Sequence, residues 1–183
     1  ELNNALEDAK IEKIHQPERD EILLYLKNSG GNAKLAISAN SANPRIHLVH
    51  EVKKNPASPP MFCMLLRKHL QNGRITGITQ PGLERIIELH VEHLNEMGDL
   101  CKKRLIVELM GKHSNIIFVN EDNVIIDSIK HISIDVNRAR QILPGKLYEY
   151  PPAQKKIPFT KITREEILQL PKGEKLAKFL FKS

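Results

Sequence analysis

The sequence has 183 residues, of which 40% are hydrophobic and 27% charged, a globular composition that excludes collagen-like, low-complexity and wholly disordered proteins. Aromatic residues make up only 4% and Trp is absent, so the core must consist mainly of Ile, Leu and Val, and a protein that stacks single strands on an aromatic platform is disfavoured. The net charge of +6 is unevenly distributed: residues 1–145 contain 19 Lys and Arg against 18 Asp and Glu, whereas residues 146–183 contain 9 Lys and Arg against 4 Asp and Glu. The C-terminal tail is therefore basic. It is either a contact site for phosphate or an acidic surface, or a solvated Lys-rich helix face.

The first 50 residues predict a short helix followed by a meander of antiparallel strands. The helix is predicted to run to about Ala9. The sequence does not begin with Met, and residues 1–7 have the pattern of the middle of a helix, so we expect the sequence to start within a longer chain. Short apolar stretches then predict strands, with a break at Pro17 and a glycine turn over Asn28–Asn32. The predicted strands are 11–15, 22–26, 35–39 and 45–49.

A buried helix is predicted next. Ser58 is a candidate N-cap, and the run Met61–Leu70 is apolar over most of its circumference. Asn72 and Gly73 follow it, and both residue types accept the left-handed conformation that ends many helices.

A second group of strands follows this helix. Apolar residues alternate from Arg85 to Val91, which predicts a half-buried strand with the odd positions inward and Arg85 at its head. Asn115–Val119 is continuously apolar, so we expect it at the centre of a sheet. The other predicted strands are 74–80, 105–109 and 124–129. Two antiparallel strand groups with two helices predict an α+β domain of β-sandwich type.

The end of the chain is expected to extend beyond this domain. Pro-rich residues 144–160 predict an extended segment packed on the domain, which gives a first domain over 1–160. Thr163 and Glu166 have the spacing of a capping box, so residues 161–183 predict a short helical extension that begins a second segment.

The sequence contains few of the residue patterns that catalysis or metal binding requires. His90 and His93 lie three positions apart on a predicted strand, so their side chains should point to opposite faces and cannot share a metal ion. His113 fits a structural position in a turn better than the role of a catalytic base. Nucleotide-binding loops and nucleophile elbows are absent. Cys63 and Cys101 lack zinc spacing and suit a reduced, cytoplasmic compartment, and no apolar run is long enough to span a membrane. We therefore expect a protein that is not an enzyme and needs no cofactor.

One charged pair stands out as a candidate binding site. Glu84 and Arg85 precede the apolar residues of the predicted 85–91 strand. A guanidinium at the edge of a core remains charged and needs a partner. From spacing alone, the pair is either a structural ion pair at the rim of the sheet or, if the turn at Pro81 and Gly82 re-aims it, a ligand site.

Several motifs together resemble the NFACT N-terminal domain of the bacterial fibronectin/fibrinogen-binding protein A family, which is associated with ribosome quality control. The resemblance covers nearly all of residues 1–160, and the tail is similar to the entry of that family's helix-hairpin-helix segment. The segments that carry it are 55–69, 105–115, 127–130, and Pro144-Gly145 with Tyr148, Pro151-Pro152 and Gln154.

The resemblance implies both a fold and a function. It implies a fold similar to the N-terminal domain of formamidopyrimidine DNA glycosylases, although their amino-terminal Pro-Glu has no counterpart here, so DNA repair chemistry is not implied. It implies a cytoplasmic protein that binds obstructed large ribosomal subunits and recruits alanyl-tRNA for C-terminal tailing of stalled chains. The alternative, implied by the family's older name, is a cell-surface adhesin that binds fibronectin or fibrinogen.

The resemblance also assigns a role to the charged pair. The family has an Asp-Arg pair implicated in tRNA binding, and it aligns with Glu84 and Arg85. Here Glu replaces Asp, which keeps the charge and moves the carboxylate outward by one methylene. A second acidic residue of the family would lie before Glu1.

Overall fold

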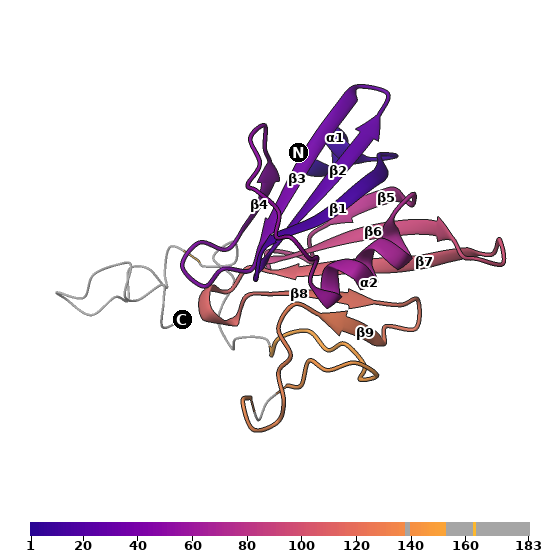
Figure 1. Ribbon diagram of the computed structural model, residues 1–183. Coiled ribbons are helices and arrows are strands. Elements are labelled where there is room, and N and C mark those ends of the chain that lie inside the picture. The colour runs from indigo at the N-terminus through magenta and orange to yellow at the C-terminus, as the bar shows by residue number, and fades with distance from the viewer. Residues whose placement is uncertain (138–139, 153–162, 164–183) are drawn as a thin grey trace. The chain divides into compact units, whose positions relative to one another are not determined.

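In the part of the chain that the structure describes, alternating apolar residues form one antiparallel sheet of nine strands, with two α-helices packed against it (Figure 1). The computed structural model describes residues 1–137, 140–152 and 163. Its sheet order is β4-β3-β2-β1-β5-β6-β7-β8-β9. The elements are α1 (Leu2–Leu6), β1 (Lys10–Glu18), β2 (Glu21–Asn28), β3 (Gly31–Ser38), β4 (Arg45–Leu48), α2 (Met61–Leu70), β5 (Arg74–Thr79), β6 (Ile86–Leu94), β7 (Leu100–Glu108), η1 (Gly111–His113), β8 (Asn115–Val119) and β9 (Ile125–Ser128).

The α+β class is confirmed, but the two expected strand groups are joined edge to edge. β1 and β5 pair in register at Lys10 and Arg74, and the Ile11 amide donates to the Gly73 carbonyl at 2.8 Å. Every other pair of neighbouring strands is consecutive in the chain. The two groups therefore form one continuous sheet rather than two facing ones. Hydrophobic alternation could not reveal this, because it fixes the faces of a strand and not its edge partners.

The main core lies between the sheet and α2. The helix has the bounds predicted from the sequence, and it buries Phe62, Cys63, Leu66 and Leu70. These side chains pack in one cluster with apolar residues from both halves of the sheet. The predicted cap at Ser58 is wrong, because the N-cap is Pro60 and no side chain caps the helix.

The junction between α2 and β5 depends on two neighbouring residues. Asn72 adopts the left-handed conformation, with φ +68°. Gly73 instead allows a close approach: a Cβ there would lie 2.9 Å from the Glu92 carbonyl oxygen of β6 and 3.0 Å from that of Leu70. Absence of a side chain therefore lets the end of α2 pack directly on β6.

A second, smaller core covers the other face of β6–β9. It contains apolar residues of these strands together with Ile142 and Tyr148 from the segment after β9. This cover explains why the whole of Asn115–Val119 is buried and why the strand is apolar from Ile116 to Val119. The predicted central position was wrong, since β8 is second from the edge of the sheet. Burial on both faces, rather than a central position, makes the strand uniformly apolar.

A buried polar cluster attaches the covering segment to the sheet. Glu108 at the end of β7 is 1% exposed, and it forms an ion pair with Arg140 and accepts a hydrogen bond from Tyr148 Oη at 2.9 Å. Burial raises the pKa of Glu108, and Arg140 and Tyr148 oppose this shift. The cluster thus satisfies a carboxylate that would otherwise be costly to bury.

The remaining sequence expectations differ at element ends. The opening helix ends at Leu6, before Asp8, whose φ is +62°. β1 continues through Pro17, where its pairing with β2 becomes irregular.

The helices predicted within 161–183 lie outside the described residues. In the described part of the chain, the helices are too short or too polar to cross a bilayer.

Candidate nucleic-acid interface

The loop between β5 and β6 presents Glu84 and Arg85 at the surface. Its backbone is held by two hydrogen bonds: the Glu84 amide donates to the Pro81 carbonyl at 3.0 Å, and Gln80 Nε2 donates to the Glu84 carbonyl at 2.7 Å. Both charged side chains are exposed. The loop therefore has an ordered backbone while its two charges face solvent.

Arg85 does not head the inward face of a strand, so that prediction was wrong. β6 begins one residue later, at Ile86, and Arg85 lies in the bend before it. Ile86 and Glu88 are buried as well as Leu89, because both faces of this strand are covered. Simple alternation therefore does not describe the start of β6. Among the residues that the structure describes, no ion pair includes Glu84 or Arg85, so the rim ion pair considered above does not form there.

A second loop brings another cation to the same end of the sheet. The Leu109 amide donates to the Arg85 carbonyl at 2.8 Å, which fixes the β7–β8 connection beside the β5–β6 loop. Lys112 and His113 lie in the 3-10 turn of this connection and are exposed. His113 thus occupies a turn, as predicted. Sequence spacing separates Arg85 from Lys112 by 27 positions, and only the strand pairing brings their loops together.

Partly buried hydrogen bonds hold this second loop in place. Lys130 Nζ donates to the Ser114 carbonyl at 3.0 Å and to the Ala39 carbonyl at the end of β3. Asn115 Nδ2 donates to the Lys130 carbonyl at 2.8 Å, and the Met110 amide donates to Ser114 Oγ at 2.8 Å. Burial lowers the pKa of Lys130. Two of the motifs that carry the family resemblance therefore form the support beneath Lys112.

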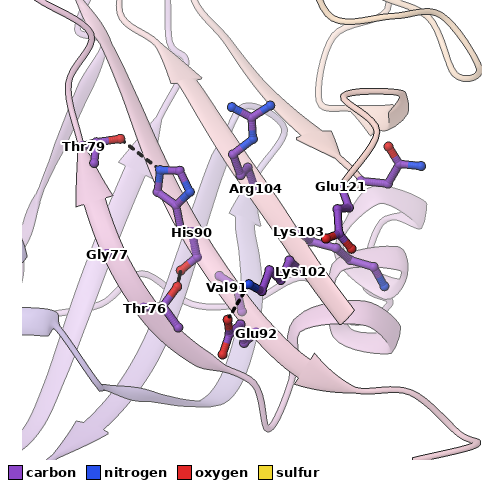
Figure 2. Close-up of a pocket in the computed structure, with 11 residues that line it drawn as sticks. Thr76, Gly77, Thr79, His90, Val91, Glu92, Lys102, Lys103, Arg104 and Glu121 are labelled. Carbon is purple, nitrogen blue, oxygen red and sulfur yellow. Dashed lines mark hydrogen bonds and ion pairs between the residues drawn. The ribbon is translucent and has the colours of Figure 1, made fainter. Parts of the chain in front are cut away.

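An open groove of about 470 Å³ lies farther along β5, β6 and β7 (Figure 2). His90 points into it and contacts Thr79 Oγ1 through Nε2 at 3.0 Å. Lys102 Nζ lies 3.6 Å from a Glu92 oxygen. These two pairs line the floor of the groove.

Two of the three cations that line this groove, Lys102 and Arg104, already have anionic partners, and the third, Lys103, contacts His69. Arg104 donates to the buried carboxylate of Glu88 at 2.8 Å and to Asn123. Lys102 is similarly paired with Glu92. Binding a phosphate here would require breaking those ion pairs. Arg85, which has no ion-pair partner among the residues that the structure describes, is therefore the better candidate for contact with an anionic ligand.

The histidines do not form a metal site in the described residues. His90 faces the groove, whereas His93 lies on the α2 side, beside Gly73. The opposite orientations predicted from their spacing are confirmed. Over residues 1–137 and 140–152, no three His, Cys, Asp or Glu side chains gather closely enough to hold an ion.

Three basic side chains meet instead between α2 and the sheet. Lys103 Nζ lies 3.1 Å from His69 Nδ1, and His93 is close enough to affect His69. Burial lowers the pKa of both histidines, and the charge of Lys103 lowers them further. Lys68 also lowers the pKa of His69, and Glu96 opposes the shift.

We expect this cluster to make the protein less stable in mild acid. Because the native state holds these histidines below their ordinary pKa, the unfolded state binds more protons. The contribution of these histidines to the free energy of unfolding should therefore not change with pH well above pH ~6.5. The free energy of unfolding should fall as the pH drops through that value. Thermal unfolding between pH 7.5 and 5.5 measures this, and His69→Gln should flatten the dependence, whereas His47→Gln at an exposed position of β4 should not. An unchanged slope in His69→Gln would contradict it.

Comparison with known proteins places this geometry in a family. The family described as NFACT N-terminal and middle domains matches residues 1–183. The Rqc2 homolog RqcH of Bacillus subtilis is 44% identical over 170 residues, which is 92% of this chain and 30% of that protein. The human ribosome quality control complex subunit NEMF is 24% identical over 182 residues, 98% of this chain and 16% of that protein.

Solved structures agree with the fold. The N-terminal domain of fibronectin-binding protein PavA from Streptococcus pneumoniae matches with a TM-score of 0.87 and 38% identity, over 99% of this chain and 68% of that one. The fibrinogen binding protein from Staphylococcus aureus matches with a TM-score of 0.83 and 36% identity, over 97% of this chain and 63% of that one. The chain spans about a third of the length of its bacterial curated relatives. It belongs to the NFACT N-terminal and middle domain family, whose curated members include ribosome quality control factors.

Proposed function

We propose that this chain is the N-terminal part of a cytoplasmic ribosome quality control factor, in which Arg85 contacts tRNA. In this proposal the whole protein binds obstructed large ribosomal subunits and recruits alanyl-tRNA for C-terminal tailing of the stalled chain. The observation that carries the RNA contact is the exposed guanidinium of Arg85, without an ion-pair partner among the described residues, on a loop whose backbone is hydrogen-bonded on both sides. The names of the relatives support the ribosomal setting.

The chemistry of the two loops suits RNA. A guanidinium donates in a planar fork that matches phosphate oxygens or the edge of a base. Glu84 beside it accepts from a base amine, and Lys112 on the adjacent loop adds a second cation for the backbone. The replacement of the family's Asp by Glu84 moves the acceptor outward, while the hydrogen bonds to the loop backbone keep its Cα in place. The protein positions tRNA in this proposal and breaks no bond itself.

Salt dependence tests the contact with phosphate. Each phosphate neutralised by a cation releases counterions, so log affinity falls linearly with log salt. About two to four contacts predict a loss of roughly 10- to 100-fold in the affinity of the full-length protein for tRNA between ~50 and ~200 mM salt. Filter binding or fluorescence anisotropy at four salt concentrations measures the slope. A flat affinity would exclude phosphate contact as the basis of binding.

The alternative function is adhesion to fibronectin or fibrinogen at the cell surface. It is favoured by the names of the two solved relatives described above. An adhesin must bind immobilised fibronectin in a saturable manner at physiological salt. Binding that does not saturate and disappears with added salt would instead reflect the charge of the basic tail. Saturable binding that survives Arg85→Ala would support the adhesin and not the RNA contact.

A further inference from the structure

The turn between β6 and β7 exposes three large apolar side chains within seven residues. Leu94, Met97 and Leu100 are 65%, 88% and 58% exposed, and Met97 is the most exposed large hydrophobic residue in the described part of the chain. Leu94 and Leu100 are cross-strand partners, so their side chains lie on one face, with Met97 beyond them. We call residues 94–100 the hairpin tip. Figure 1 shows this hairpin extending past the neighbouring strands, at the right of the view.

The hairpin tip has an ordered backbone. Asn95 Oδ1 accepts hydrogen bonds from the amides of Met97 and Asp99, each at 2.9 Å, and Asn95 Nδ2 donates to the Asp99 carboxylate at 3.1 Å. The Asn95 amide also donates to the Asp99 carbonyl, and Gly98 supplies a φ of +87°. The apolar side chains are therefore presented by a preorganised turn, which reduces the entropy lost when a partner binds.

The charge of the hairpin tip indicates the kind of partner. Its only charged residues are Glu96 and Asp99, both exposed, and it contains no Lys or Arg. The two carboxylates repel phosphate, and aliphatic side chains cannot form the ion pairs and hydrogen bonds by which proteins bind the RNA backbone. Grouped exposed apolar side chains with a polar rim are instead typical of protein contact sites. The hairpin tip thus fits an apolar protein pocket rimmed by cations.

We propose that the hairpin tip docks into such a pocket on a basic protein of the large ribosomal subunit. This inference rests on the proposed function, which places the protein on that subunit. Ribosomal proteins lie against polyanionic RNA and are rich in Lys and Arg, so their surfaces complement Glu96 and Asp99. Arg85 lies at the opposite end of β6, about 30 Å away along nine residues of strand. One rigid strand therefore separates the RNA contact from the protein contact.

Site-specific crosslinking identifies the occupant. The full-length protein carrying a photo-reactive amino acid at Met97 is bound to purified large subunits with a stalled nascent chain, irradiated and analysed by mass spectrometry. We expect a crosslink to a peptide of one ribosomal protein that contains Lys or Arg beside apolar residues. A crosslink to ribosomal RNA, a crosslink only within the same chain, or none at all would overturn the proposal.

A matched pair of variants measures the contribution of the hairpin tip. Met97→Asp should lower the affinity of the full-length protein for large subunits, measured by co-sedimentation, by about tenfold or more, which is the effect of losing an interface hot spot. Met61→Asp is the control, because Met61 on α2 is 83% exposed and lies outside the hairpin tip. It should leave subunit binding unchanged. Equal losses in both variants, or no loss in Met97→Asp, would overturn the proposal.

A measurement without ribosomes separates this inference from the function on which it rests. Met97→Asp should keep the tRNA affinity of the wild-type protein, since the hairpin tip and Arg85 lie at opposite ends of β6. If the wild-type protein fails to bind tRNA at all, the proposed RNA contact fails, whatever the subunit assay shows. If tRNA binding is normal and Met97→Asp binds subunits normally, the docking proposal alone fails.

Discussion

Arg85→Ala should abolish C-terminal alanine tailing by the full-length protein while leaving its fold intact. Loss of a guanidinium that contacts a phosphate or a base edge costs about 1–3 kcal/mol of binding, which is roughly 5- to 150-fold in tRNA affinity. Because the side chain is exposed and has no ion-pair partner in the described part of the chain, its removal should change the free energy of unfolding by no more than about 0.5 kcal/mol. Binding of labelled tRNA and a tailing assay on stalled subunits measure the first effect, and thermal unfolding measures the second.

Two further variants make this result specific. Lys27→Ala removes the same charge from an exposed position near the end of β2, and it should retain tailing. Arg85→Lys keeps the charge but loses the planar fork, so partial activity would indicate phosphate contact and full loss would indicate recognition of a base edge or bidentate geometry. If Arg85→Ala lowered the melting temperature strongly, Arg85 would be structural and the proposed contact would be wrong.

Glu108→Leu should destabilise the protein more than any surface change. It leaves the guanidinium of Arg140, only 8% exposed, without its carboxylate, and it removes the carboxylate that accepts the hydrogen bond of Tyr148 Oη. Breaking a buried pair in this way costs about 3–5 kcal/mol. In a chain of this size, that lowers Tm by roughly 6–20 °C. Glu51→Leu, at an exposed position, should change little, and thermal unfolding of both variants at neutral pH makes the comparison.

A double variant shows whether the loss comes from the unpaired guanidinium. Replacing both partners, as in Glu108→Leu with Arg140→Met, removes the buried charges together and should recover much of the lost stability. The coupling free energy from this cycle reports the pair itself. If the double variant were as unstable as the sum of the single ones, the destabilisation would come from altered packing near Ile142 rather than from charge.

Local signals in the sequence predicted the local structure well. Met61–Leu70 has the predicted helix bounds, and β8 has the predicted strand bounds. Each depends on periodicity and flanking residues within one segment. The joining of β1 to β5 was not predictable in this way, because it is a contact between distant edges. The fold that the family resemblance implies, similar to the N-terminal domain of formamidopyrimidine DNA glycosylases, stays a prediction.

The candidate site was only partly visible in the sequence. Glu84 and Arg85 were identified as a pair, but alternation placed Arg85 inward, because periodicity does not show that the strand begins only at Ile86, after the bend that contains Arg85. Lys112 was part of a family-like motif without an assigned role. The position of its loop beside the loop of Arg85 follows from the pairing of Ile86 with Glu108 across β6 and β7. A search for exposed cations on loops that leave one end of the same strand pair would have found it.

The single pairing of β1 with β5 has a consequence for how the chain is made. Lys10 and Arg74 are 64 positions apart, whereas every other strand pair is a local hairpin or meander. During synthesis from the N-terminus, β1 to β4 leave the ribosome first and can pair among themselves with short loops. Their apolar face then lacks the cover of α2 until that helix emerges, and β1 has an open edge until β5 arrives. Translation speed through residues 50–75 thus sets how long the nascent half-sheet is exposed to chaperones and to aggregation.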